Sequence, residues 1–113
     1  MNFDITQHDQ IALVVSRVEK LDASNATELK GELIALNKQG INSIILDLSE
    51  TRYCDSSGLS SILVANRLCK DTSGKFVLCN LQPNVLKMIG IAQLDKVLSI
   101  ADSVEMANSL MLN

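Results

Sequence analysis

Two adjacent serines that follow an aspartate are the residues of this 113-residue chain best suited to chemistry. They belong to the segment Cys54-Asp55-Ser56-Ser57-Gly58-Leu59, which lies between a polar loop and a helical apolar pattern from about 57 to 70. Asp and Ser are preferred helix N-caps, so the segment predicts the start of a helix. A serine hydroxyl there can also accept a phosphoryl group, whose charge of about -1.5 to -2 the helix dipole tolerates.

Gly58 indicates that the segment has a role besides capping the helix. A glycine in the first helical turn costs up to about 1 kcal/mol relative to Ala. It is easier to understand where another backbone or a partner must approach closely. A phosphoryl group here would lie beside Asp55 on the outer surface, and it would change partner binding while hardly altering the fold. The residues therefore leave two alternatives, a plain helix cap and a phosphorylation switch.

Catalysis by these side chains has little support in the sequence. A serine hydrolase needs a base, and the only histidine, His8, falls in a predicted hairpin turn. A small hydrolase with Ser57 or Cys54 as its nucleophile is an alternative that lacks this base. No phosphate-binding glycine loop and no Cys-x-x-Cys pair occur, so Cys54, Cys69 and Cys79 are expected to be buried free thiols. We expect a protein without enzyme activity, cofactor or metal.

Composition narrows the possible partners and the compartment. The net charge is -3, the cations are scattered, and aromatic residues make up only 3%, which argues against nucleic acid and anionic membranes. No apolar run approaches the roughly 20 residues that span a bilayer, and no signal peptide is recognisable. With 47% hydrophobic residues, we expect a single folded domain over residues 1–113 in the cytoplasm. The oligomeric state is not predicted.

Strand and helix patterns alternate along the chain. Strands are predicted at residues 3–6, 11–15, 44–48, 75–79 and 97–100, the first two joined by a turn at 7–10. Helices are predicted at about 26–36, 57–70, 83–90 and 104–110. The N-cap of the first helix is expected to be Asp22, Ser24 or Asn25. The third helix begins at Pro83, and Asp102 is expected to cap the last. The order β-β-α-β-α-β-α-(β)-α predicts an α/β fold with a mixed sheet covered by helices.

Several of these segments together resemble a known family. Two neighbouring segments resemble the signature of the STAS domain: Leu46-Asp47-Leu48-Ser49 and Tyr53-Cys54-Asp55-Ser56-Ser57-Gly58-Leu59. Leu21-Asp22 with Ala26, Leu29 and Lys30 is similar to the family's first-helix entry, and Leu81-Gln82-Pro83-Asn84-Val85 to its later strand-to-helix turn. The likeness covers nearly the whole chain and is strongest to stand-alone anti-sigma factor antagonists. One departure is Val18-Glu19-Lys20-Leu21-Asp22, where the family commonly has Gly-Glu-Leu-Asp.

The resemblance implies a STAS-like mixed sheet and a partner-switching protein. The implied partners are an anti-sigma factor that is also a serine kinase of the histidine-kinase-like ATPase fold, and a PP2C-type phosphatase. The unphosphorylated antagonist would bind the kinase and free the sigma factor until the kinase phosphorylates Ser56; on chemistry alone, Ser57 is equally eligible. The implied partner-binding residues are Asp22, Asp55, Ser56, Ser57, Gly58 and Leu59. A regulatory or scaffold subunit of an anion-transport, lipid-transport or stress-sensing complex is the alternative within the same family.

Overall fold

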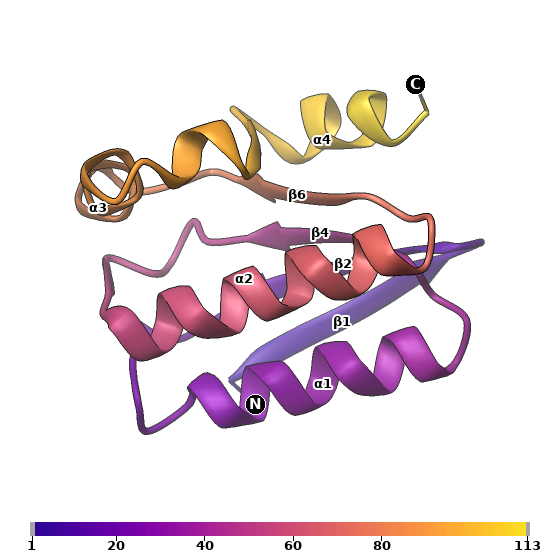
Figure 1. Ribbon diagram of the computed structural model, residues 1–113, viewed down its shortest axis with the longest axis horizontal. Helices are drawn as coiled ribbons and strands as arrows, with labels where there is room; N and C mark the ends of the chain where they lie inside the picture. The colour runs from indigo at the N-terminus through magenta and orange to yellow at the C-terminus, as the bar shows by residue number, and fades with distance from the viewer. Residues whose placement is uncertain (1, 113) are drawn as a thin grey trace.

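The computed structural model describes residues 2–112 and contains a mixed sheet with helices on both faces (Figure 1). The main sheet has five strands in the order β1-β2-β4-β6-β7. β1 (Phe3–His8) and β2 (Ile11–Ser16) form an antiparallel hairpin, and β4 (Ser43–Asp47), β6 (Phe76–Cys79) and β7 (Ser99–Ala101) continue the sheet in parallel with β2. The expected α/β class, with one hairpin at its start, is confirmed.

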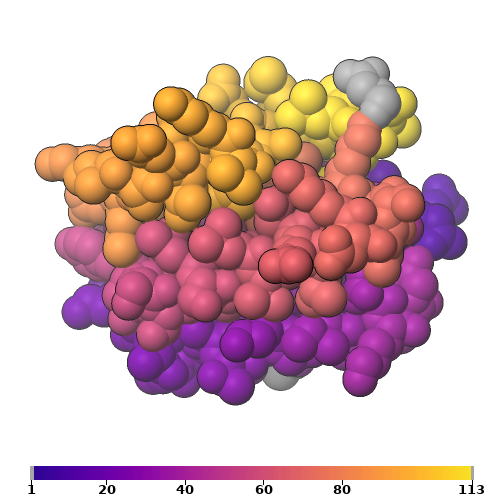
Figure 2. Space-filling view, in the orientation of Figure 1, coloured from indigo at the N-terminus to yellow at the C-terminus, as the bar shows by residue number. Residues whose placement is uncertain are grey.

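The helices divide between the two faces of the sheet. α1 (Ala26–Lys38), α2 (Ser56–Asp71) and α3 (Pro83–Ile91) bury their apolar sides in the larger core. α1 and α2 lie side by side (Figure 1 and Figure 2). α4 (Val104–Met111) packs on the opposite face against β4, β6 and β7. A short 3-10 turn, η1 (Leu94–Lys96), connects α3 to β7. No helix within residues 2–112 is long and apolar enough to cross a membrane.

The first hairpin is tighter than the sequence predicts. β1 runs to His8, which pairs with Ile11, so only Asp9 and Gln10 form the turn. Asp9 has a φ of 55°, the left-handed conformation that two-residue hairpin turns require. The placement of His8 in the turn was therefore wrong: it is an exposed strand residue.

The cap of α4 also differs from its prediction. Ser103, not Asp102, has the extended backbone of an N-cap, and its Oγ accepts a hydrogen bond from the Met106 amide at 3.1 Å. Both residue types cap helices well, so the sequence alone does not distinguish them. Ser103 is therefore the residue that caps the start of α4 at Val104.

A second, two-stranded sheet has no counterpart in the prediction. β3 (Lys20–Leu21) pairs in parallel with β5 (Tyr53–Cys54), inside segments that the sequence presents as polar linker and loop. Strands of two residues are too short to display an alternating pattern, so they leave no periodic signal. This small sheet lies directly before α2 and holds the start of that helix.

Candidate functional site

α2 is capped by an aspartate and not by a serine. Asp55 has an extended backbone, and its Oδ1 accepts a hydrogen bond from the Gly58 amide at 3.0 Å. Within residues 2–112, no hydrogen bond involves the side chain of Ser56 or Ser57. The fold therefore uses neither hydroxyl to hold the helix, and both are available for another role.

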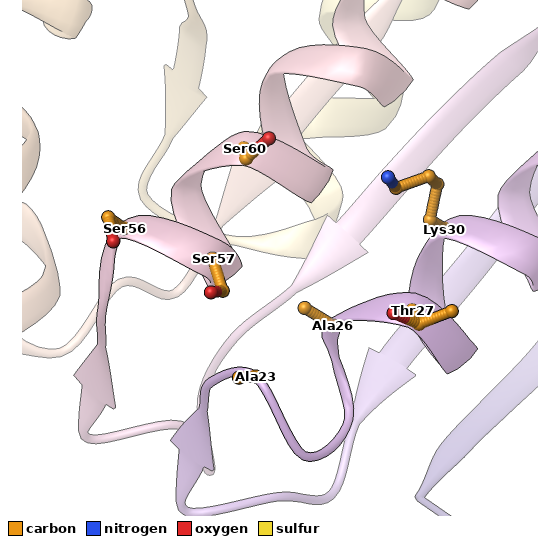
Figure 3. Close-up of a pocket in the computed structure, with 7 residues that line it drawn as sticks. All are labelled: Ala23, Ala26, Thr27, Lys30, Ser56, Ser57 and Ser60. Atoms are coloured by element: carbon orange, nitrogen blue, oxygen red, sulfur yellow. The ribbon is translucent and has the colours of Figure 1, made fainter.

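The two serines differ in how they are presented. Ser56 is exposed at the first residue of α2, whereas Ser57 is half-buried. In Figure 3, Ser57 points toward Ala26 at the start of α1, and Ser56 lies on the other side of the first turn of α2. A hollow of about 340 Å³, here the α1–α2 hollow, is lined by Ala23, Ala26, Thr27, Lys30, Ser56, Ser57 and Ser60. Ser56 is therefore the more accessible of the two serines.

Gly58 is required by a close backbone contact. A Cβ atom at this position would overlap the carbonyl oxygen of Leu21 and lie 2.6 Å from Cys54 Sγ. The Leu21 carbonyl also accepts a hydrogen bond from the Asp55 amide at 3.1 Å. The expected close approach is thus confirmed, and the neighbour is the chain's own strand β3. Gly58 and Leu59 are both buried, so they shape this surface from beneath.

Asp22 lies beside the motif although 33 residues separate it from Asp55. Both aspartates line a second hollow of about 490 Å³, here the aspartate hollow, with Lys20, Tyr53 and Cys54. The Asp22 carboxylate accepts hydrogen bonds from the hydroxyl and the amide of Ser24, and these bonds lower its pKa. The sequence-predicted residues Asp22, Asp55, Ser56 and Ser57 are therefore brought together on one surface.

The start of α1 is fixed by Asn25. This residue occupies the N-cap position, one of the three predicted, but its side chain makes no capping bond to the helix. Its Oδ1 accepts from the Asp22 amide at 3.0 Å, and its Nδ2 donates to the Lys20 carbonyl at 2.8 Å. Asn25 therefore ties the Asp22 turn to strand β3, which holds Asp22 at the rim of the aspartate hollow.

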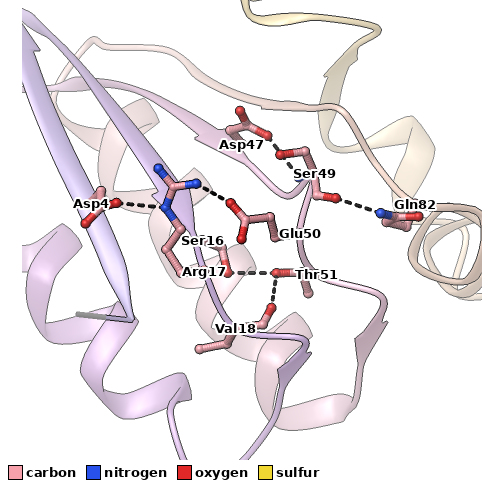
Figure 4. Close-up of polar contacts among 9 residues, drawn as sticks. All are labelled: Asp4, Ser16, Arg17, Val18, Asp47, Ser49, Glu50, Thr51 and Gln82. Carbon is pink, nitrogen blue, oxygen red and sulfur yellow. Dashed lines mark hydrogen bonds and ion pairs between the residues drawn. The ribbon is translucent and has the colours of Figure 1, made fainter.

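A buried pair of hydroxyls anchors the loop that precedes β5 (Figure 4). Thr51 Oγ1 lies 2.7 Å from the Val18 carbonyl oxygen, to which it donates, and 2.7 Å from Ser16 Oγ. A hydroxyl has a single proton, so Ser16 is the donor in the second bond. Ser16 and Thr51 are fully buried, and neither was predicted from the sequence. One feature of the sequence could have indicated Ser16: it is a polar residue at an inward-facing position of β2, in alternation with Ala12 and Val14.

Polar contacts at the surface hold the same loop from two further sides (Figure 4). Arg17 pairs with Asp4 at 2.7 Å and also with Glu50. Gln82, just before α3, donates from Nε2 to the Ser49 carbonyl at 2.6 Å. The loop is thus tied to β1, to β2 and to the entry of α3, so the position of the motif is set by the whole carboxyl edge of the sheet.

The cysteines have the environment of inert thiols. Cys54, Cys69 and Cys79 are free and buried, as expected. Burial raises the pKa of Cys54 to about 12, and the charge of Asp55 adds to this effect. Because the thiolate is the nucleophile, a Cys54 held as the thiol at neutral pH is a poor candidate for covalent catalysis. His8 is not among the residues that line either hollow.

Comparisons with known proteins agree with this geometry. A family model described as STAS domain matches residues 2–107. The Bordetella bronchiseptica protein named "Putative anti-sigma factor antagonist BtrV" is 31% identical over 87 residues, 77% of this chain and 75% of that protein. The anti-sigma F factor antagonist of Paenibacillus polymyxa is 27% identical over 105 residues, 91% of this chain and 90% of its own. The crystal structure of TM1081 from Thermotoga maritima has a TM-score of 0.88 at 24% identity, covering 98% and 95% of the two chains.

Proposed function

Because this chain belongs to the STAS domain family, we propose that it is an anti-sigma factor antagonist that phosphorylation of Ser56 switches off. Its unphosphorylated form binds an anti-sigma factor that is also a serine kinase of the histidine-kinase-like ATPase fold, and thereby frees a sigma factor. A PP2C-type phosphatase restores the active form. Residues 1–113 act as a single domain in the cytoplasm. The names of the curated relatives support the class of function, and the resemblance of the Asp-Ser-Ser-Gly motif supports the switch.

The observation that carries the proposal is the free hydroxyl of Ser56. It is exposed at the first residue of α2, and Asp55 supplies the cap in its place. A kinase can modify this hydroxyl without breaking a contact that holds the fold. Ser57 is half-buried and faces α1, which favours Ser56 as the acceptor.

Charge explains how one phosphoryl group would act on a partner and spare the fold. The group adds about -1.5 to -2 charges at the N-terminus of α2, where the helix dipole stabilises an anion. The same charge falls next to Asp55, which lines the aspartate hollow together with Asp22, on the surface that the partner covers. Phosphorylation therefore adds negative charge and bulk to a binding surface that already carries two carboxylates. Asp22, Asp55, Ser56 and Ser57 contact the partner, while Gly58 and Leu59 support them from the core.

The proposal is tested by capture from native lysate on four forms of the protein. The baits are the wild type, Ser56→Asp, Ser57→Asp and Ser60→Asp, and the captured proteins are identified by mass spectrometry. Ser60 is the matched control, since it is an exposed serine of the same helix that lines the α1–α2 hollow. We expect the wild type and Ser60→Asp to capture a serine kinase of the stated fold and Ser56→Asp to lose it.

The captured kinase then provides the direct assay. Incubated with ATP, it should phosphorylate the wild type on Ser56, as located by peptide mass spectrometry, and leave Ser56→Ala unmodified. Capture of the same transporter or scaffold by all four baits would instead establish the alternative role as a subunit of a transport or stress-sensing complex. Phosphorylation at Ser57 alone would keep the switch and move its site.

A further inference from the structure

One aromatic side chain is presented at the surface beside the motif. The chain has three aromatic residues, and two of them, Phe3 and Phe76, are each 3% exposed within the core. The third, Tyr53, is 45% exposed and stands three residues before Ser56. Exposed rings with a polar tip combine large apolar area with a hydrogen-bonding group, and they are enriched among the residues that dominate binding energy at interfaces.

The backbone of Tyr53 is held by strand β3, and its ring lies near Lys20. Tyr53 pairs with Lys20 in the two-stranded sheet, and the Tyr53 amide donates to the Glu19 carbonyl at 3.1 Å. Lys20 Nζ lies 5.9 Å from the ring centroid, within the range of a cation–π contact. A side chain with a fixed backbone and a neighbouring contact loses less conformational entropy when a partner covers it than an unrestrained one does.

Tyr53 lines two depressions of the surface. On one side is the aspartate hollow, which it shares with Asp22 and Asp55. On the other is a depression of about 160 Å³ that it lines with Arg52, Gln82, Pro83 and Asn84. A protein that covers Asp55 and enters the aspartate hollow therefore also contacts the ring. Within residues 2–112, the Tyr53 hydroxyl has no hydrogen-bond partner and is available to one.

We propose that Tyr53, oriented by Lys20, is the aromatic anchor through which this chain binds its anti-sigma factor kinase. The inference rests on the proposed function and adds to it the residue that supplies affinity. The kinase face that fits has an apolar pocket for the ring and a carboxylate opposite Lys20. Affinity and regulation are thus divided between neighbours: Tyr53 supplies the contact, and Ser56 decides whether the contact forms.

The first test measures binding by calorimetry, with the purified kinase that the wild-type bait captures as the probe. We expect Tyr53→Ala to weaken the dissociation constant by at least about tenfold and Tyr53→Phe by less than about threefold, since the ring carries the contact. Met106→Ala is the matched control: Met106 is 52% exposed, and its helix lies on the opposite face of the sheet. Thermal unfolding of each variant shows whether a loss of binding reflects a loss of fold.

Kinetics separate an anchor from a residue that acts on phosphoryl transfer. A contact made equally in the bound complex and in the transition state changes KM and leaves kcat unaltered. Tyr53→Ala should therefore raise the KM for phosphorylation of the antagonist about tenfold, with kcat within about twofold of the wild type. A fall in kcat at unchanged KM would overturn the anchor.

A third measurement needs no substitution at Tyr53. The chain contains a single tyrosine, so labelling with 3-fluorotyrosine gives one ¹⁹F resonance. We expect that resonance to shift when unlabelled kinase is added to the wild type, and to stay in place with Ser56→Asp. A resonance that is unchanged by a kinase that binds, or a Tyr53→Ala affinity within about twofold of the wild type, overturns the anchor and leaves the switch intact. If the wild type binds no kinase at all, the proposed function fails, and the anchor fails with it.

Discussion

The starts of α2 and α4 contain the same two residue types in the same order and use them differently. Each helix follows a strand through an Asp-Ser pair, Asp55-Ser56 in one case and Asp102-Ser103 in the other. At α4 the serine occupies the N-cap and accepts from the Met106 amide. At α2 the aspartate occupies the N-cap, and the serine becomes the first helical residue with its hydroxyl unused. A shift of one residue thus separates a structural serine from one that is available for modification.

The third helical residue of each helix sharpens the contrast. In α2 it is Gly58, pressed against the backbone of β3. In α4 it is Met106, which is 52% exposed. One helix start is packed against a neighbouring strand and the other faces solvent. The packed start is the one that holds a surface in a fixed shape, as a binding site requires.

The largest predicted effect follows from this packing. Gly58→Ala should lower the free energy of unfolding by about 2–3 kcal/mol, because the new methyl group overlaps a backbone carbonyl that cannot move aside. Gly31→Ala is the control, since nothing lies within 4 Å of a Cβ atom there, and it should stabilise α1 by up to about 1 kcal/mol. Urea unfolding of both variants measures the difference. Equal stability of the two would contradict the close contact.

The next prediction compares the serines themselves. Ser103→Ala should lower the free energy of unfolding by about 1 kcal/mol, the usual effect of losing a capping hydroxyl. Ser56→Ala should change it by less than about 0.5 kcal/mol, because the hydroxyl of Ser56 makes no contact that the fold uses. Thermal or urea unfolding under matched conditions provides both numbers. The reverse order would show that the two helix starts had been assigned the wrong way round.

The smallest predicted effect concerns the start of α1, where a serine is used in a third way. Ser24 donates its hydroxyl and amide protons to the Asp22 carboxylate, which lowers the pKa of Asp22. Ser24→Ala should move that pKa upward, toward the usual value for Asp, as measured by carbon-13 NMR of the carboxyl group. Because the folded-state pKa is the lower one, the stabilisation is complete above the ordinary range of Asp and is lost as pH falls through the lowered pKa. An unchanged titration in Ser24→Ala would remove Ser24 as the cause.

The sequence was sufficient where a pattern repeats over several residues. The apolar runs at 44–48 and 75–79 and the helical spacing after Ser57 predicted the layers of the fold, because burial imposes a period on apolar residues. The requirement for a glycine at position 58 was also predictable, since a glycine in a helical turn needs a reason. The elements that position the candidate site were predicted only in part.

The rest depended on contacts between residues that are distant in the chain. Strands β3 and β5 are two residues each, so their pairing leaves no period in the sequence. Asp55 caps α2, whereas Ser103 caps α4. Both residue types accept the same hydrogen bond, so the choice depends on where the preceding strand ends. The link from Thr51 to Ser16 and Val18 joins segments more than 30 residues apart. Local propensity contains no information on such pairs.

The contact between Leu21 and the first turn of α2 has a consequence for how fast a partner binds. The Asp22 turn and the Ser56 turn are joined through the Leu21 carbonyl, which bonds to the Asp55 amide and leaves no room for a side chain at Gly58. The two halves of the surface therefore reach a partner as one preformed body, with no segment to fold during the encounter. Association then proceeds at the rate at which the two proteins collide in a suitable orientation, and the lifetime of the complex sets its affinity.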